Sequence, residues 1–248
     1  MKKESFYYRV EESVATITFT DFRGDKAHYP QTTAGFEDVI KKVISDSSVR
    51  VVIISGKEVF CPGTSYEGRE PVTRNSFCSI IDKIDLPVVA AIKGNAFGQG
   101  LELALACDLR FCSKGAHFAM PQIIMGEIPW DGGTQRLSRL VGRGKAMEMI
   151  LTGESIDAGC AGEIGLVNRV VDPEDLMATV METAQDMASK GPIALRYAKE
   201  AICKGMDLTL DQGLRLEADL YFLLHTTMDR IEGIKAFQEK RDPKFERR

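Results

Sequence analysis

A short glycine-rich stretch followed by one carboxylate is the part of this sequence best suited to chemistry. Glycines stand at Gly94, Gly98 and Gly100, and Glu102 follows two residues after the last of them. The apolar run VVAAI before the glycines and the apolar residues after them predict a buried strand, a tight turn and a helix. Backbone N–H groups at such a helix start can hold an anion or a developing oxyanion. Glu102 would lie about one turn in, beside whatever is held there, although a helix dipole alone also favours a glutamate at this position.

Strands and helices alternate over the first two-thirds of the chain and would position this turn. Residues 6–10 and 14–18 have the pattern of a hairpin, and the continuous apolar runs at 50–55 and 88–92 are typical of strands buried on both faces. Further strands are predicted at 109–112 and 166–171. Helical spacing predicts helices at 32–44, 76–84, 101–107, 136–141, 145–151 and 173–189, with Asp172 as the cap of the last one.

The pattern changes at Gly191-Pro192, beyond which the strand signals stop. Residues 193–203, 210–225 and 229–238 all have helical periodicity. We therefore predict an α/β body over 1–190 and a helical region over 191–248. The segment LRLEADLYFLLHTTM is unusually apolar for an exposed helix, so it either covers its own core or contacts another copy of the chain.

Composition excludes several classes of protein. The 248 residues are 44% hydrophobic and 27% charged, as in an ordinary globular protein, and no run of about 18 apolar residues predicts a membrane span. The N-terminus lacks the pattern of a secretory signal or an organelle transit peptide, so we expect a cytoplasmic protein. A net charge of −4 without a basic, aromatic-rich stripe argues against nucleic acid. The six scattered cysteines indicate reduced thiols, and the three isolated histidines predict no metal site.

Four segments, in the same order, resemble the crotonase (enoyl-CoA hydratase/isomerase) superfamily. They are RVVIISGKEVFCPG, LPVVAAIKGNAFGQGLELALACDLRF, the stretch from AHFAMPQ to GLVNRVV, and FQEKRDPKF. The similarity spans nearly the whole chain, and GGTQRL and AMEMILTGE are its most specific parts. The resemblance implies an α/β fold, a spiral of β-β-α turns whose C-terminal helices build trimers, often paired into hexamers. It also implies an acyl-CoA substrate, with no metal and no cofactor beyond the coenzyme A that the substrate carries.

The resemblance assigns roles to individual residues. Two backbone N–H groups bind the thioester oxygen, and here they fall on Thr64 and Gln99. Fixed donors of this kind stabilise the negative charge that grows on that oxygen. Glu102 matches the first of two catalytic glutamates in enoyl-CoA hydratases, where it would deprotonate water or move a proton at the β- or γ-carbon. The residues expected to bind substrate are Lys26, Ala27, Cys61, Gly63, Gly98, Gly100 and Trp130, with Lys26, Arg69 and Arg74 as candidates for the CoA phosphates.

The sequence departs from the family at the second glutamate, because Met120-Pro121-Gln122 replaces the usual QPE. An amide can position a water molecule but cannot exchange a proton at a useful pKa. Glu102 could therefore carry the proton chemistry alone while Gln122 orients the water. Alternatively, Asp131, or less favourably Glu127, could substitute for the missing carboxylate, although Asp131 beside glycines is also an ordinary turn residue. A third explanation is a reaction other than simple hydration.

Trp130 stands where the family has a small residue, and it would narrow the acyl site if it faced the pocket. It is equally compatible with a partly exposed loop aromatic. We predict an acyl-CoA lyase that reversibly hydrates an α,β-unsaturated, dienoyl or cyclic acyl-CoA. The alternatives are an isomerase or decarboxylase that uses the same oxyanion hole, and a non-catalytic protein that binds acyl-CoA.

Overall fold

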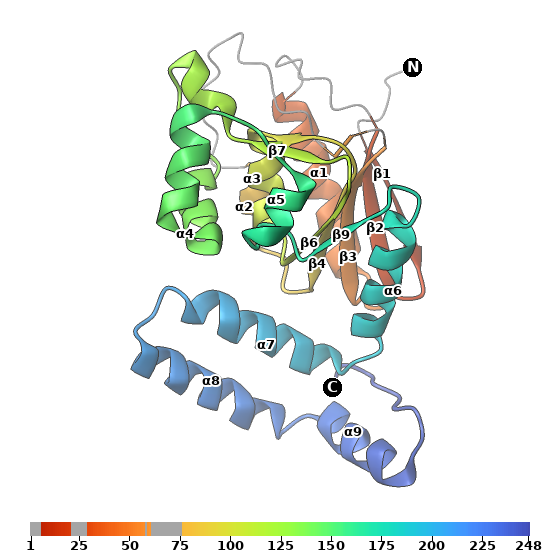
Figure 1. Ribbon diagram of the computed structural model, residues 1–248. Coiled ribbons are helices and arrows are strands. Elements are labelled where there is room, and N and C mark those ends of the chain that lie inside the picture. Colours follow the sequence, from red (N-terminus) through yellow and green to blue (C-terminus); the bar gives the residue numbers. More distant parts are fainter. Residues whose placement is uncertain (1–5, 21–28, 58, 61–75) are drawn as a thin grey trace.

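The main sheet has six strands within the residues that the computed structural model describes, which are 6–20, 29–57, 59, 60 and 76–248 (Figure 1). The strand order is β1-β2-β3-β4-β6-β9. β1 and β2 form the predicted antiparallel hairpin, and the remaining neighbours are parallel. The strand bounds are Phe6–Glu11 for β1, Val14–Phe19 for β2, Val51–Gly56 for β3, Val88–Ile92 for β4, Leu109–Ser113 for β6 and Arg169–Val171 for β9.

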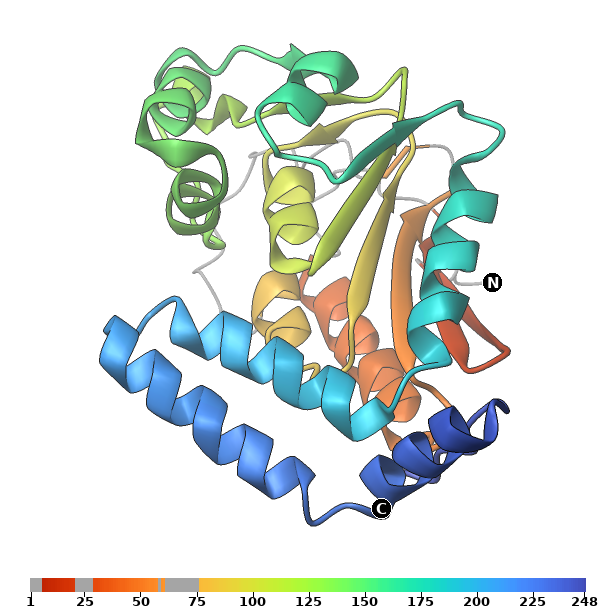
Figure 2. The ribbon, with the colours of Figure 1, turned by 60° about the horizontal axis from the view of Figure 1, so that its bottom comes forward.

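The central strands are buried on both faces, as their continuous apolar runs predict. On β3, Val52 and Ile54 belong to a core shared with three helices, α1 (Tyr29–Ser45), α2 (Phe77–Ile81) and α3 (Gln99–Ala106). Val51 and Ile53 point the other way and pack against α6 (Leu176–Ala188). Strand side chains alternate between faces, so a strand between two helical layers must be apolar throughout. Figure 2 shows these two layers on either side of the sheet.

A second sheet of three very short strands supports the site and was not predicted. It contains β5 (Ala96–Phe97), β7 (His117–Ala119) and β8 (Ile156–Asp157), with β5 parallel to β7 and β7 antiparallel to β8. Segments of two or three residues are too short to show a hydrophobic period. β7 leads into the 3₁₀ helix η2 (Pro121–Met125), and β8 leads into α5 (Ala158–Glu163).

Several helix predictions differ in detail from the structure. The helices predicted at 136–141 and 145–151 are parts of α4 (Gly133–Thr152), which is kinked where Gly142 adopts φ 79° and ψ 159°. The predicted cap at Asp172 is wrong, because α6 starts at Leu176 with Asp175 in the cap position. Asp172 instead pairs with Lys114, its Oδ1 lying 2.7 Å from the lysine Nζ.

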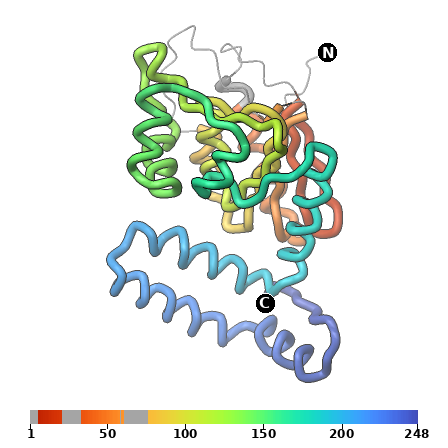
Figure 3. Tube along the Cα trace, in the orientation of Figure 1, coloured from red at the N-terminus to blue at the C-terminus, as the bar shows by residue number. Residues whose placement is uncertain are grey.

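The C-terminal helices form a layer of their own, which Figures 1 and 2 show below the sheet. These helices are α7 (Pro192–Gly205), α8 (Leu210–Leu224) and α9 (Met228–Glu239), close to the three predicted ranges. Lys199 ties α7 to the body through Asp108 Oδ2 at 2.7 Å and the Leu86 carbonyl at 2.8 Å. The chain then turns back, as the tube in Figure 3 shows, and the Phe245 carbonyl accepts a hydrogen bond from Arg50. The division at residue 190 stays a prediction.

Large apolar side chains remain exposed on this layer. They include Ile202, Met206, Leu210, Leu214, Phe222 and Phe237, the last with 85% of its surface accessible. Across the described ranges, no helix combines the length and hydrophobicity that a membrane span requires. The five cysteines in these ranges are free thiols, and three of them are buried.

Candidate active site

The pairing of β5 with β7 brings the two central site residues together, although they are twenty positions apart. Phe97 lies opposite Ala119, and the Gly98 N–H donates to the Ala119 carbonyl at 2.9 Å. α3 then starts from one strand and η2 from the other. Glu102 and Gln122 are therefore both fully buried and face each other, with 3.5 Å between Gln122 Nε2 and Glu102 Oε2.

The two oxygens of Glu102 have different environments. Oε1 accepts hydrogen bonds from the backbone N–H groups of Asp131 at 2.7 Å and Gly133 at 2.8 Å. Oε2 has, from the described part of the chain, only the long contact with Gln122 Nε2 at 3.5 Å. Two short bonds from the backbone fix the orientation of the carboxylate at Oε1.

The pKa of Glu102 is shifted toward neutral pH. Burial raises the pKa of Glu102 to about 7, against an ordinary value of 4.5. The N–H bonds from Gly133 and Asp131 oppose that rise in pKa, the negative charge of Asp131 adds to it, and the positive charge of Arg136 opposes it. A carboxyl with a pKa near neutrality can both accept and return a proton at physiological pH.

Gln122 adds an acceptor next to this carboxylate. Its Nε2 faces Glu102, so its Oε1 points elsewhere, and within the described part of the chain this fully buried oxygen accepts no hydrogen bond. A buried oxygen without a donor is unfavourable unless a ligand or water supplies one. The amide is therefore suited to hold a water molecule or a substrate hydroxyl beside Glu102.

The glycine turn has the predicted helix start. Gly98 precedes α3 with φ 51° and ψ −119°, a backbone conformation that side chains disfavour, and Gln99 and Gly100 begin the helix as buried residues. The Glu102 N–H donates to the Gly98 carbonyl at 3.0 Å, the first helical bond. The N–H groups of the preceding residues thus point out of the helix end, as an oxyanion site requires.

Asp131 lies close to Glu102, but its carboxylate is turned toward α2. Its Oδ1 accepts a hydrogen bond from Ser76 Oγ at 2.5 Å, and its Oδ2 accepts a longer one from the Cys78 N–H at 3.4 Å. Only the backbone N–H of Asp131 reaches Glu102. Glu127 is exposed, and Trp130 is half-buried in the loop before Asp131.

Five of the predicted site residues lie outside the described residues. These are Lys26, Ala27, Cys61, Gly63 and Thr64, and the two candidates for the CoA phosphates, Arg69 and Arg74, lie outside them as well.

Gly133 contacts Glu102 directly, which the sequence did not predict. A β-carbon there would lie 3.0 Å from both Cγ and Oε1 of Glu102 and 2.8 Å from Cβ of Pro129. The close approach lets the Gly133 N–H reach the carboxylate. The paired glycines of GGTQRL are its sequence signal, but their purpose depends on a residue 31 positions earlier.

Replacing Gly133 with alanine is therefore expected to displace the Glu102 carboxylate. A displacement of about 1 Å at a catalytic group can cost on the order of 10² in rate. We expect kcat to fall by about that factor, with a much smaller change in KM. The matched control is Gly144→Ala, since a β-carbon at Gly144 would meet no neighbouring atom. Equal kcat values for the two variants would contradict this account of Gly133.

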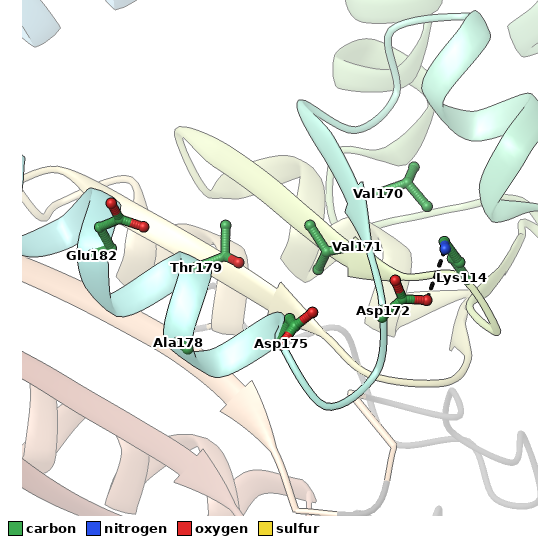
Figure 4. A pocket seen from close by; sticks show the side chains of 8 residues that line it. All are labelled: Lys114, Val170, Val171, Asp172, Asp175, Ala178, Thr179 and Glu182. Carbon is green, nitrogen blue, oxygen red and sulfur yellow. Dashed lines mark ion pairs between the residues drawn. The ribbon is translucent and has the colours of Figure 1, made fainter.

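A surface hollow on the far side of the main sheet is a poor candidate for the acyl-CoA site (Figure 4). It lies between β9 and α6, and its lining includes Asp172, Asp175 and Glu182, with Lys114 paired to Asp172. Three carboxylates would repel the phosphates of coenzyme A. Among the described residues, moreover, no group of His, Cys, Asp and Glu side chains could hold a metal ion.

Comparison with known proteins identifies the family. The enoyl-CoA hydratase/isomerase family model matches residues 9–248. The chain belongs to the enoyl-CoA hydratase/isomerase family. The crotonyl-CoA hydratase of Syntrophomonas wolfei is 36% identical over 257 aligned residues, 99% of each chain. The short-chain-enoyl-CoA hydratase of Clostridium acetobutylicum is 36% identical over 243 residues, 93% of each chain.

The structural comparison agrees. An enoyl-CoA hydratase from Geobacillus kaustophilus superposes with a TM-score of 0.89 at 35% identity, and the match covers 98% of both chains. The predicted crotonase-like fold is therefore confirmed, and so is the prediction of an enzyme of the enoyl-CoA hydratase type. The family members named here are hydratases, which are lyases.

Proposed function

We propose that this protein reversibly adds water across the α,β double bond of an enoyl-CoA thioester, with Glu102 as its proton-transfer group. The observation that carries the proposal is the buried Glu102 carboxylate, held at one oxygen by two N–H groups and facing Gln122 with the other. Its pKa of about 7 suits a group that must both take and give a proton.

The proposed reaction begins with the thioester oxygen between the backbone N–H groups of Thr64 and Gln99. Gln122 Oε1 and Glu102 Oε2 each accept a hydrogen bond from one water molecule. Glu102 takes a proton from that water, the water oxygen bonds to the β-carbon, and the π electrons move to the thioester oxygen. Protonated Glu102 then gives the proton to the α-carbon as the thioester carbonyl re-forms. The oxyanion donors stabilise the enolate, and each such donor is typically worth about 10²–10³ in rate.

We further propose that the substrate contacts lie around this pair. Gly98 and Gly100 allow the thioester to approach the start of α3, and Trp130 forms a wall of the acyl site. Lys26, Ala27, Cys61 and Gly63 complete the site. No cofactor is needed beyond the coenzyme A of the substrate, because the reaction transfers only a proton and a hydroxyl.

The test is to incubate the purified protein with crotonyl-CoA, a linear dienoyl-CoA, a cyclic dienoyl-CoA and methylmalonyl-CoA, and to follow product masses. Gain of one water on any ester supports hydration, and the preferred ester shows what Trp130 selects. Loss of CO₂ would indicate a decarboxylase instead. Unchanged masses with a migrated double bond would indicate an isomerase. Binding of an ester without any chemical change would indicate a non-catalytic protein.

Isomerisation is the second candidate, and the amide at position 122 favours it. Moving a double bond needs one group that removes a proton from one carbon and returns it to another, so a single carboxylate is sufficient. Among the described residues, the side chain that faces Glu102 across the site is the amide of Gln122. The Asp131 carboxylate is turned toward α2.

Replacing Gln122 with glutamate is expected to raise crotonyl-CoA hydration by at least about tenfold, because a positioned proton-transfer group typically contributes 10²–10⁴. Two facing carboxylates also raise each other's pKa, so the acid limb of the pH profile should move to higher pH. Gln122→Met is the control, since it keeps the volume but cannot hold water. If the glutamate variant hydrates crotonyl-CoA no faster than wild type does, the site is shaped for another reaction.

We also propose that the protein is a homo-oligomer, a trimer or hexamer, in which α7–α9 contact a neighbouring copy. The exposed apolar side chains of these helices support this assignment, since surfaces of this kind usually mark an interface. A variant that ends before Ile193 should be insoluble or monomeric in sedimentation experiments.

A further inference from the structure

One loop residue, Asp131, contacts its surroundings through three different groups. Its N–H donates to Glu102 Oε1 at 2.7 Å. Its carboxylate accepts hydrogen bonds from Ser76 Oγ at 2.5 Å and the Cys78 N–H at 3.4 Å. Its carbonyl oxygen accepts a hydrogen bond from Arg136 at 2.9 Å. These contacts fix both the peptide plane and the side chain of a residue that is only 7% exposed.

Two of these contacts lead to opposite ends of α2. Ser76 is the N-cap of α2, where its hydroxyl accepts a hydrogen bond from the Ser79 N–H in a capping box. Arg136 reaches the other end, since its second guanidinium nitrogen lies 2.5 Å from Oδ2 of Asp82, the C-cap residue. The loop that holds Glu102 is therefore fastened to both ends of one helix.

α2 is itself anchored in the core. Phe77, its first residue, is fully buried, and its ring centroid lies 5.3 Å from that of Phe36 on α1 and 5.8 Å from that of Phe19 on β2. Edge-to-face aromatic contacts of this kind restrict movement of the helix relative to the sheet. The position of Asp131, and hence of the N–H that it offers to Glu102, is set by the core through α2.

We propose that Asp131 is a positioning residue rather than a proton-transfer group: its bond to Ser76 fastens its loop to α2 and so holds the N–H that Asp131 donates to Glu102 Oε1. This inference rests on the proposed role of Glu102 as the base. The direction of the Asp131 carboxylate supports it, because each oxygen accepts a hydrogen bond from the α2 side.

The charged groups around Glu102 predict the direction in which each substitution should shift its pKa. Among the residues that the structure describes, the ionisable groups around Glu102 are Asp131, Arg136 and the thiol of Cys78, and Gln122 adds a neutral amide. The Asp131 charge raises the pKa of Glu102, and the Arg136 charge lowers it. If Glu102 acts as a base, the acid limb of the kcat/KM profile follows its pKa. Removing the Asp131 charge should move that limb to lower pH, and removing the Arg136 charge should move it to higher pH.

The experiment compares Asp131→Asn and Arg136→Met with wild type. We expect the acid limb to shift by roughly one pH unit in opposite directions, a typical effect of one nearby charge. At the plateau of its profile, Asp131→Asn should keep kcat within about tenfold of wild type, because no proton passes through the residue. Glu154→Gln, which removes an exposed carboxylate, is the control for charge alone and should leave the limb unchanged.

A second pair of variants separates the tether from the charge. Ser76→Ala removes the bond to Asp131 but keeps its carboxylate, so kcat should fall several-fold while KM and the acid limb stay unchanged. Ser76→Thr keeps a hydroxyl and should restore kcat. A kcat of Ser76→Ala equal to that of wild type would overturn the positioning role.

Different results would contradict the positioning role of Asp131 and the proposed hydration reaction. A loss of 10³ or more in Asp131→Asn at every pH would make Asp131 a proton-transfer group. The titration of Glu102 can also be followed without substrate, by NMR of protein labelled with ¹³C in the glutamate carboxyls, using Glu102→Gln to assign the signal. If no ester is turned over, the proposed function fails, yet opposite shifts in this titration would still support the coupling. Identical titrations in wild type, Asp131→Asn and Arg136→Met would overturn it.

Discussion

Replacing Glu102 with glutamine is expected to lower kcat by at least about 10³, which is within the range for a single group that both removes and returns a proton. Binding of the CoA ester should stay within a few-fold of wild type. The glutamine oxygen can still accept the N–H bonds from Asp131 and Gly133, so the geometry of the site is kept. Gln122 can rotate its amide to present Oε1 to the new NH₂ group, because that oxygen has no donor within the described residues.

The measurement is single-turnover kinetics on whichever ester the mass assay identifies, together with the dissociation constant of a non-reacting CoA thioether. The thermal midpoint of Glu102→Gln serves as the control for folding, and we expect it to be no lower than that of wild type at pH 8. A carboxyl with a raised pKa loses solvation when it ionises in the folded protein, and the amide avoids this cost. An active Glu102→Gln enzyme would remove Glu102 from the mechanism.

The largest effect on stability is expected for Arg110→Met. The Arg110 side chain is 6% exposed, and its guanidinium donates to three backbone carbonyls, those of Cys107 at 2.6 Å, Leu166 at 2.9 Å and Ala104 at 3.4 Å. Ala104 and Cys107 lie at the C-terminal end of α3, where the Ala104 carbonyl also accepts a hydrogen bond from the Cys107 N–H at 3.2 Å. Methionine fills similar space but removes the guanidinium donor from the Cys107 and Leu166 carbonyls, which costs about 1–3 kcal/mol for each buried group.

We therefore expect a loss of about 3–5 kcal/mol in the free energy of unfolding. Urea denaturation at a fixed protein concentration measures it, since assembly would otherwise shift the midpoint. Arg139→Met is the matched control: Arg139 is an exposed arginine on α4 that bonds to Gln135 and lies near Asp207, and its loss should cost less than about 0.5 kcal/mol. Similar midpoints for the two variants would show that the buried guanidinium contributes little.

The sequence was sufficient for the elements that have a strong local signal. The runs at 50–55 and 88–92 form β3 and β4 because a strand between two helical layers must be apolar on both faces. The glycine turn before Glu102 forms the start of α3. Gly98 adopts φ 51° there, a backbone conformation that strongly favours glycine. The order and type of the long elements follow from such patterns, whereas the pairing of Glu102 with Gln122 as candidate site residues is what the resemblance to the crotonase superfamily implies.

The sequence could not show how remote segments complete the site. β5, β7 and β8 are too short for a hydrophobic period, yet the pairing of β5 with β7 places Gln122 against Glu102. Glycine at 133 is required by a side chain 31 residues away. Asp131 has the sequence signal of a catalytic carboxylate, but its oxygens accept hydrogen bonds from Ser76 and Cys78. Local periodicity determines elements, whereas contacts between distant segments depend on how those elements pack, so only the folded chain reveals them.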